Sequence, residues 1–416
     1  MKKVDERIPH EVGTGFYPST PALRSPWGKL MDYRDAVHYA TDYNSMLTVL
    51  QTDAFRILMP DYVERAKLMC EVSYASGRQS VLRIDEDGNN ASISSHHIHP
   101  FCRGNFVGAL QADWGDEMNA MCGRVNDFGS HRVEKELDEC SWAIVGSDLC
   151  RQTISTLQGL CDQLADIQPQ GGPRIEYSMV EAIGTGDRHC RVVAEDREKW
   201  PLPPRENWQG FGPIATEDYI KFTPEEDCVS EPAVLRADCD YTYVGGTKHE
   251  DNAFQLMGCI FCSAGLWYIL PAVQEAIDRG IFTAEQYSYT LARVATAAGK
   301  ASFQAPFAVE GVRQWLGVPH AIKERDGRIL GGYIEMYLQC MRAPYEVEAF
   351  NEEEVVYVVN RASLSYGNEL YVQTMLWYWF GAAKTLMSPQ WSVWEEDSPE
   401  GKLRIRIGKK IDKYSL

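Results

Sequence analysis

Positive charge is scarce in this sequence. Its 416 residues include 41 Lys and Arg against 59 Asp and Glu, which gives a formal net charge of −18 at pH 7. Nucleic acids and anionic membrane surfaces are recognised by basic patches. The charge balance therefore argues against nucleic acid and membrane as partners, and it leaves cationic and neutral ligands open.

Three other features are missing. The longest apolar run, Ala253 to Leu270, contains Gln255 and is followed by Pro271, so it predicts a buried core helix instead of a membrane span. The 12 cysteines follow no disulfide framework and no signal-peptide pattern is visible, which predicts reduced thiols in the cytoplasm. The sequence also has no dinucleotide-binding, DNA-binding or ATPase motif.

The block from His131 to Glu195 has the clearest pattern. An extended, acidic entry from Val133 to Val145 leads into a predicted helix from Ser147 to Asp166. Glycines within Gly184 to Asp187 supply the positive φ of a tight turn and predict a hairpin from Tyr177 to Glu195. The helix is indicated by an apolar stripe at three- and four-residue spacing: Leu149, Cys150, Thr153, Ile154, Leu157, Leu160, Cys161 and Leu164.

A similar order returns near the C-terminus. An extended stretch from Val347 to Val359 precedes a predicted helix from Gly367 to Leu386 and a predicted hairpin from Trp391 to Ile407. Such self-similarity predicts a duplication of about 200 residues. Its anchors are Val133 and Ile144-Val145, which align with Val347 and Val358-Val359 at an offset of 214, and ILMP at 57–60, which aligns with YILP at 268–271 at an offset of 211.

We therefore predict an α+β protein of two similar helix-rich units, each with a small antiparallel sheet, packed as a pseudo-dimer. Residues 1–42, rich in Pro and Gly, form an extended arm on the surface of a unit or of a partner subunit. Residues 43–197 form the first unit, with a short strand at 81–84. Residues 198–253 are a linker or a lid, and residues 254–416 form the second unit as a degenerate copy.

The segment from Ser94 to Phe106 holds the densest chemistry. It contains His96, His97, His99 and Cys102, and in an extended chain His97 and His99 point to the same side. These two histidines with Cys102 are a candidate site for a divalent metal such as Zn, Fe or Mn. Asp116 or Glu117 are further candidate ligands. The alternative is a polar loop whose histidines hydrogen-bond locally.

Two further residues are candidates for catalysis. His131 lies in a loop just before the central block. Cys190 is flanked by His189 and by arginines at 188 and 191, which would lower the pKa of its thiol and favour a role as nucleophile or ligand. The alternative for Cys190 is structural packing, because free cysteines are among the most buried residues.

The helix followed by Gly186-Asp187-Arg188-His189-Cys190 resembles the closing motif of the L-2-amino-thiazoline-4-carboxylate hydrolase-like family and of the related 4-vinyl reductase-like domains. The resemblance covers Tyr43 to Arg197 and, more faintly, Phe254 to Ile411. It implies α+β modules that enclose a small ligand and tend to pair. Some relatives hold zinc near this hairpin, which would map onto Cys150, Glu181 and Cys190, although their Glu-x-x-Cys pair is absent here.

These observations predict a cytosolic enzyme, a hydrolase or lyase, that acts on a small cyclic or aromatic molecule. The alternative is a small-molecule-binding, sensor-like protein without catalysis. A scaffolding protein and a redox or tetrapyrrole-linked protein have less support, and a homo-oligomer is compatible with the sequence. The candidate catalytic residues are His97, His99, His131, Glu181 and Cys190.

We place the predicted pocket in the first unit, because the side chains that titrate near neutral pH are concentrated there. The second unit is instead rich in aromatic residues, which indicates either a seam between the two units or an aromatic-lined pocket. The tryptophans in question are Trp377, Trp379, Trp391 and Trp394.

Overall fold

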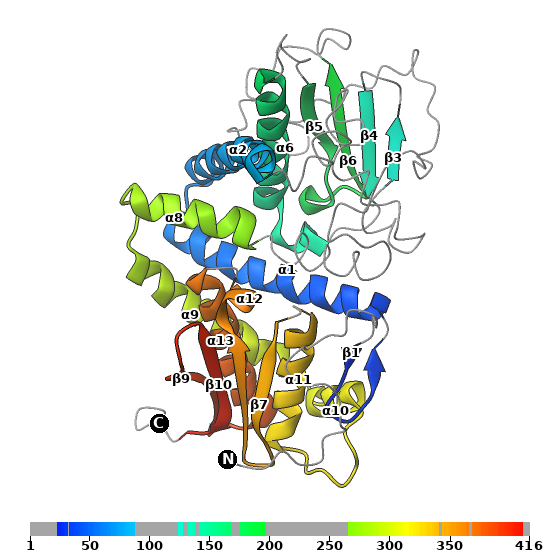
Figure 1. Ribbon diagram of the computed structural model, residues 1–416, viewed down its shortest axis with the longest axis vertical. Helices are drawn as coiled ribbons and strands as arrows, with labels where there is room; N and C mark the ends of the chain where they lie inside the picture. The colour runs from blue at the N-terminus through cyan, green and yellow to red at the C-terminus, as the bar shows by residue number, and fades with distance from the viewer. Residues whose placement is uncertain are drawn as a thin grey trace. The chain divides into compact units, whose positions relative to one another are not determined.

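The computed structural model describes residues 23–31, 33–87, 124–127, 132–137, 141–167, 175–196, 265–340, 343–365 and 368–410. Within them the chain is α+β, as predicted. Helices combine with one two-stranded and two four-stranded antiparallel sheets (Figure 1). The histidine-rich segment, His131 and the predicted linker at 198–253 lie outside the described residues.

The described elements form two compact units. Unit 1 comprises β1 (Leu23–Arg24), β2 (Leu30–Met31), α1 (Tyr33–Leu58), α9 (Ala284–Ser302), α10 (Ala308–Leu316), α11 (Gly327–Cys340), β7 (Tyr345–Phe350), β8 (Glu354–Asn360), α12 (Arg361–Ser365), α13 (Glu369–Ala382), η7 (Ala383–Met387), β9 (Trp391–Glu396) and β10 (Lys402–Lys409). Unit 2 comprises α2 (Tyr62–Asp87), β3 (Arg124–Asp127), β4 (Arg132–Leu137), η1 (Ser141–Val145), α6 (Ser147–Ile167), β5 (Ile175–Glu181), η2 (Ile183–Thr185), β6 (Cys190–Asp196) and α8 (Leu270–Asp278). The π-helical turn η6 (Gly265–Ile269) leads directly into α8.

Helix α9 begins at a capping box. The Thr283 hydroxyl accepts a hydrogen bond from Gln286 N at 3.2 Å, and Gln286 Oε1 accepts one from Thr283 N at 2.8 Å. Two backbone donors at the helix start are thereby satisfied. One face of α9 is buried through a four-residue repeat of Tyr287, Leu291, Ala295 and Gly299.

Helices α9 and α13 cross with their backbones in direct contact. A Cβ added to Gly299 would collide with the carbonyl oxygen of Tyr378, and one added to Gly381 would collide with that of Thr296. Any larger side chain at these glycines would push the helices apart. At the same crossing the Thr296 hydroxyl donates a hydrogen bond to Trp377 O at 3.4 Å.

The sheet of unit 1 has the strand order β7-β8-β10-β9. Strand β10 shows the two-residue alternation expected of a sheet with one buried face. Its Leu403, Ile405 and Ile407 are buried. Its Arg404 and Arg406 lie on the other face, where they pair with Glu348 of β7, Glu354 of β8 and Glu396 of β9.

Residues 23–31 pack against α10 and α11, with Ser25 and Trp27 buried. Arg24 N donates to Gln339 Oε1 at 3.0 Å, Gln339 Nε2 donates back to Arg24 O at 2.7 Å, and Ser25 Oγ donates to Leu316 O at 2.7 Å. The arm is shorter than the predicted 1–42, because α1 already begins at Tyr33.

Unit 2 has the strand order β3-β4-β6-β5, with α2 and α6 packed together and α6 beside β5 (Figure 1). A Cβ at Gly159 of α6 would collide with the carbonyl oxygen of Tyr74 of α2. The strand predicted at 81–84 is wrong, because α2 continues to Asp87. Once a helix has begun, each added residue gains a hydrogen bond, which outweighs the β propensity of four residues.

From α2 to α6, the described elements of the first half recur in the second half at an offset of about 222 residues, whereas the strands of the closing hairpins, β5 and β6, precede β9 and β10 by 216 and 212 residues. The offset of 222 carries the first residues of α2, β4 and α6 onto those of α9, β8 and α13. The predicted anchors, at offsets of 211 and 214, do not fall at corresponding positions. Val133 lies in the second strand of its sheet and Val347 in the first of the other, and Ile144-Val145 lie in η1 whereas Val358-Val359 lie in β8.

Each unit contains one helix from the other half of the chain. At the offset of 222, α1 corresponds to η6 and α8, and buried positions coincide, such as Leu47 with Ile269 and Ala54 with Ala276. Yet α1 belongs to unit 1, where it contacts α9, and α8 belongs to unit 2, where it contacts α2. None of the described helices is apolar over a length that would cross a membrane.

The glycine crossing generates a stability prediction. Gly381→Ala is expected to lower the free energy of unfolding by about 1–3 kcal/mol, because the new methyl group forces α9 and α13 apart. Gly311→Ala is the matched control on α10, where a Cβ meets nothing within 4 Å, and it is expected to add about 0.5–1 kcal/mol. Urea unfolding measures the free energy of unfolding of both variants. Equal losses in the two variants would contradict the close approach of α9 and α13.

The exchanged helices generate a second prediction. Fragments 1–225 and 226–416, expressed separately, should each fail to melt cooperatively, because each lacks a buried helix of its main unit. Co-expressed, they should copurify with the helical content of the intact chain. Circular dichroism and gel filtration report both results, and a cooperative thermal transition in either lone fragment would refute the exchange.

Candidate functional site

A pocket of about 1070 Å³ lies in unit 1, entirely within the second half of the chain. Ligand pockets usually measure about 300–1,000 Å³, so its volume suits a sizeable organic molecule. The pocket is lined by Ser288, Tyr289, Ala292, Arg293, Thr296, Ala297 and Lys300 of α9, Gln373, Leu376, Trp377 and Phe380 of α13, Ser392, Val393, Trp394 and Glu395 of β9, and Lys410.

The sequence of α13, ELYVQTMLWYWFGA, supplies the aromatic base of the pocket. This helix is apolar on all sides, and a helix of that kind is ordinarily buried all round. One side of it does enter the core, with Tyr371, Met375 and Trp379 buried. The other side faces the pocket, and there Trp377 remains 39% exposed.

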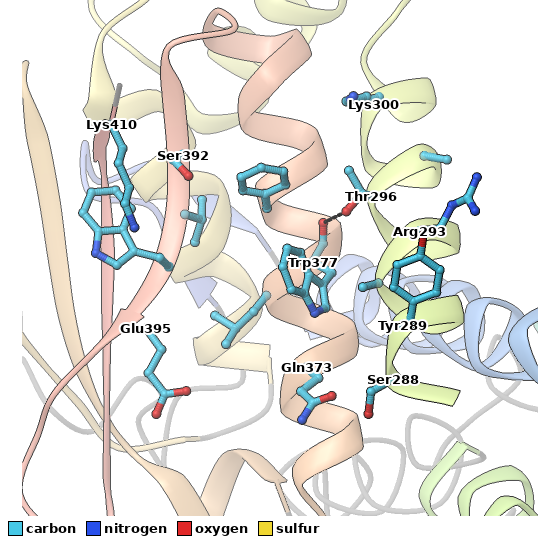
Figure 2. A pocket seen from close by; sticks show the side chains of 16 residues that line it. Ser288, Tyr289, Arg293, Thr296, Lys300, Gln373, Trp377, Ser392, Glu395 and Lys410 are labelled. Atoms are coloured by element: carbon cyan, nitrogen blue, oxygen red, sulfur yellow. Dashed lines mark hydrogen bonds between the residues drawn. The ribbon is translucent and has the colours of Figure 1, made fainter. Parts of the chain in front are cut away.

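The other two walls come from α9 and β9. Figure 2 shows Trp377 between Tyr289 and Arg293 of α9 on one side and Ser392 and Lys410 on the other. Tyr289 is 65% exposed. The lining residues of α9 recur every three or four residues, because they occupy the helix face next to the buried stripe.

The pocket carries more positive than negative charge. Its cations are Arg293, Lys300 and Lys410, and none of them forms an ion pair with another described residue. Its single carboxylate, Glu395, accepts a hydrogen bond from Arg361 Nη1 at 2.6 Å. The charge of Glu395 is thus neutralised beside the pocket, while the cations face solvent.

Hydroxyl groups are the candidate nucleophiles of the lining. Its 16 residues contain three hydroxyl side chains other than Tyr289, namely Ser288, Thr296 and Ser392, and they include no histidine or cysteine. The Thr296 hydroxyl already donates a hydrogen bond to Trp377 O. Nucleophilic catalysis requires a base within hydrogen-bond reach of the nucleophile. Glu395, the one lining carboxylate, is bound to Arg361 instead.

The sequence-predicted site residues lie in the first half of the chain. His97, His99, Cys102 and His131 are outside the described residues, so their predicted roles stay predictions. Glu181 and Cys190 are described, and both belong to the β5–β6 hairpin. The Glu181 carboxylate lies 2.8 Å from His189 Nε2, and both side chains are partly exposed.

The hairpin motif Gly186-Asp187-Arg188-His189-Cys190 builds its own turn. Gly186 has φ = 100°, a conformation that favours glycine. Asp187 Oδ2 accepts a hydrogen bond from Ala182 N at 2.8 Å, and Cys190 Sγ accepts one from Ile183 N at 3.2 Å. Cys190 is buried, which agrees with the structural alternative for this residue.

Cys150, Glu181 and Cys190 do not form the zinc site that the resemblance implied. Cys150 Sγ faces Gly184, and Cys190 Sγ faces Ile183 N, while Glu181 pairs with His189. Within the described parts of the chain, no three His, Cys, Asp or Glu side chains are grouped so as to hold a metal ion.

The corresponding face of the first half has a different surface. At the offset of 222, Tyr289 and Trp377 correspond to Lys67 and Ser155. The face of α2 that corresponds to the pocket-lining face of α9 carries three charged side chains, and each forms an ion pair at 2.9 Å. Lys67 pairs with Glu64, Glu71 with Arg279, and Arg78 with Asp166. The pocket described here therefore belongs to the half that was predicted to be degenerate.

Two sequence signals could have located this pocket. One is the helix 369–382, whose apolar residues leave no polar face. The other is the spacing V-x-x-A-x-G-[R/K]-x-S, found at 72–80 and again at 294–302, which gives the offset of 222 directly. Of the four tryptophans singled out above, Trp377 and Trp394 line the pocket, whereas Trp379 and Trp391 are buried.

No protein-family model, no curated protein and no solved structure matches the chain. The resemblance to the thiazoline-carboxylate hydrolase-like family therefore stays a prediction.

The thiols of unit 2 generate a prediction about reactivity. Burial raises the pKa of Cys70 to about 11 and that of Cys150 to about 12. Both groups are thus protonated at pH 8, well below these pKa values, and the thiolate is the reactive form. Iodoacetamide at pH 8 should leave Cys70 and Cys150 unmodified in the native protein and modify both in urea, as read by peptide mass spectrometry. Rapid modification of either thiol in the native protein would contradict the raised pKa values.

Proposed function

We propose that this protein binds a flat, ring-containing organic molecule in the pocket formed by α9, α13 and β9. The observation that carries the proposal is the exposed side of α13. Trp377 is 39% exposed on a helix that is apolar on all sides, and Tyr289 stands exposed on the facing helix. Aromatic side chains gain free energy when a flat ring stacks on them and excludes water.

We further propose that binding occurs without turnover, which favours the sensor-like alternative over the hydrolase or lyase. The support is the lining itself, which offers hydroxyl groups but no histidine or cysteine, and whose one carboxylate is paired with Arg361. The enzyme hypothesis rests on residues of the first half, and most of these lie outside the described residues.

A cytoplasmic location and an origin by duplication belong to the same proposal. Cys70 and Cys150 are free thiols, as expected in a reducing compartment. The shared strand order and the offset of 222 between α2 and α9, β4 and β8, and α6 and α13 support duplication of one ancestral module. In this interpretation one copy kept a ligand pocket, while the other copy has a structural role.

The test is a titration with 2-naphthamide, a neutral flat probe, followed by calorimetry. Trp377→Ala should weaken binding about 5- to 30-fold, because loss of one aromatic contact removes roughly 1–2 kcal/mol. The matched control is Phe307→Ala, which removes an 81% exposed aromatic residue of the same unit outside the pocket. This control should bind the probe as the unmodified protein does.

Two results would overturn the proposal. One is the absence of any probe binding by the unmodified protein. The other is gel filtration showing a dimer that Trp377→Ala dissociates, which would make the aromatic surface an interface between two copies of the chain.

A further inference from the structure

We infer that the ligand of this pocket is an organic acid whose acidic group is held by Arg293, with Lys300 and Lys410 adding positive charge. The inference rests on the proposed function and names the chemical class of its ligand. It concerns the same pocket, and it assigns to three cations a role that ring stacking alone does not require.

The local charge is opposite to the charge of the whole chain. The protein carries a net charge of −18, yet three cations line this one pocket. The only carboxylate in the lining, Glu395, is paired with Arg361 at 2.6 Å. An anionic ligand would therefore be attracted into the pocket, whereas a cationic ligand would meet like charge.

Two of the cations lie beside aromatic rings that also line the pocket. The Arg293 guanidinium lies 5.7 Å from the ring centre of Tyr289, one helical turn earlier on α9. On the opposite wall Lys410 Nζ lies 5.0 Å from the ring centre of Trp394. A flat ring stacked on either aromatic residue would bring an acidic substituent near the adjacent cation.

Arg293 is the better partner for the acidic group. Its planar guanidinium can donate two parallel hydrogen bonds to one carboxylate, which a lysine ammonium cannot do in the same geometry. The first half of the chain supplies the contrast, because Glu71 takes the place of Arg293 there and is paired with Arg279 at 2.9 Å. An arginine that forms no ion pair with another described residue is therefore a feature of the second half and not of the shared framework.

The test uses three probes with one ring system: 2-naphthoate, 2-naphthamide and 2-naphthylmethylammonium. Each is titrated by calorimetry into the unmodified protein and into Arg293→Gln, Arg293→Lys and Lys410→Gln. The unmodified protein should prefer the naphthoate over the amide by roughly tenfold and bind the ammonium probe weakest. Arg293→Gln should abolish most of this preference without changing the affinity for the amide, and Arg293→Lys should restore only part of it.

The control variant is Lys323→Gln, which removes an exposed cation of the same unit that is paired with Glu352 outside the pocket. It should leave the preference unchanged. Equal binding of the naphthoate and the amide, or a preference that survives Arg293→Gln, would overturn the inference while leaving the proposed function in place. Failure of all three probes to bind would overturn the proposed function itself.

Discussion

The close crossing of α9 and α13 is the constraint on which the rest of unit 1 depends. Gly299 and Gly381 allow each helix to touch the carbonyl oxygens of the other. With the backbones this near, neither helix can rotate without losing contact along its length. Their outer faces are therefore fixed relative to each other, and these faces carry Tyr289, Arg293 and Trp377. A pocket built on two rigid helices holds its side chains more closely than one built on loops.

The helix from the other half of the chain secures the opposite side of this crossing. On α1, Gln51 Nε2 donates to the Thr374 hydroxyl at 3.2 Å, and Gln51 O accepts a hydrogen bond from Tyr287 at 3.0 Å. Both bonds are buried, so breaking either would leave a polar group unsatisfied away from water. Unit 2 also contains a buried glutamine that hydrogen-bonds to the segment from the other half of the chain, since Gln152 Nε2 donates to Tyr268 O at 2.8 Å. Directional bonds of this kind fix the position of each exchanged helix, which apolar contacts alone would leave less defined.

The two halves share the same arrangement of helices and strands and differ in the side chains on their exposed faces. The same crossing recurs at Gly159 and Tyr74 in unit 2, and both four-stranded sheets have the same strand order. On the outer face, however, ion pairs in one half stand where exposed aromatic residues and unpaired cations stand in the other. The positions that build the fold are buried and tolerate little change, whereas the exposed positions are free to diverge. This difference is the reason why we place the proposed ligand site in the second half.

The sequence by itself determined the α+β class, the central helix from Ser147 and the hairpins that follow the helices in both halves, because each rests on local periodicity or turn chemistry. It also indicated the aromatic character of the second half. Only the tertiary structure decided which helix packs in which unit, since a buried stripe does not specify its partner. It also decided that Trp377 is exposed while Trp379, two residues away, is buried, and that Cys190 serves the turn at Ile183. Such outcomes depend on contacts between residues far apart in the chain, which no local pattern encodes.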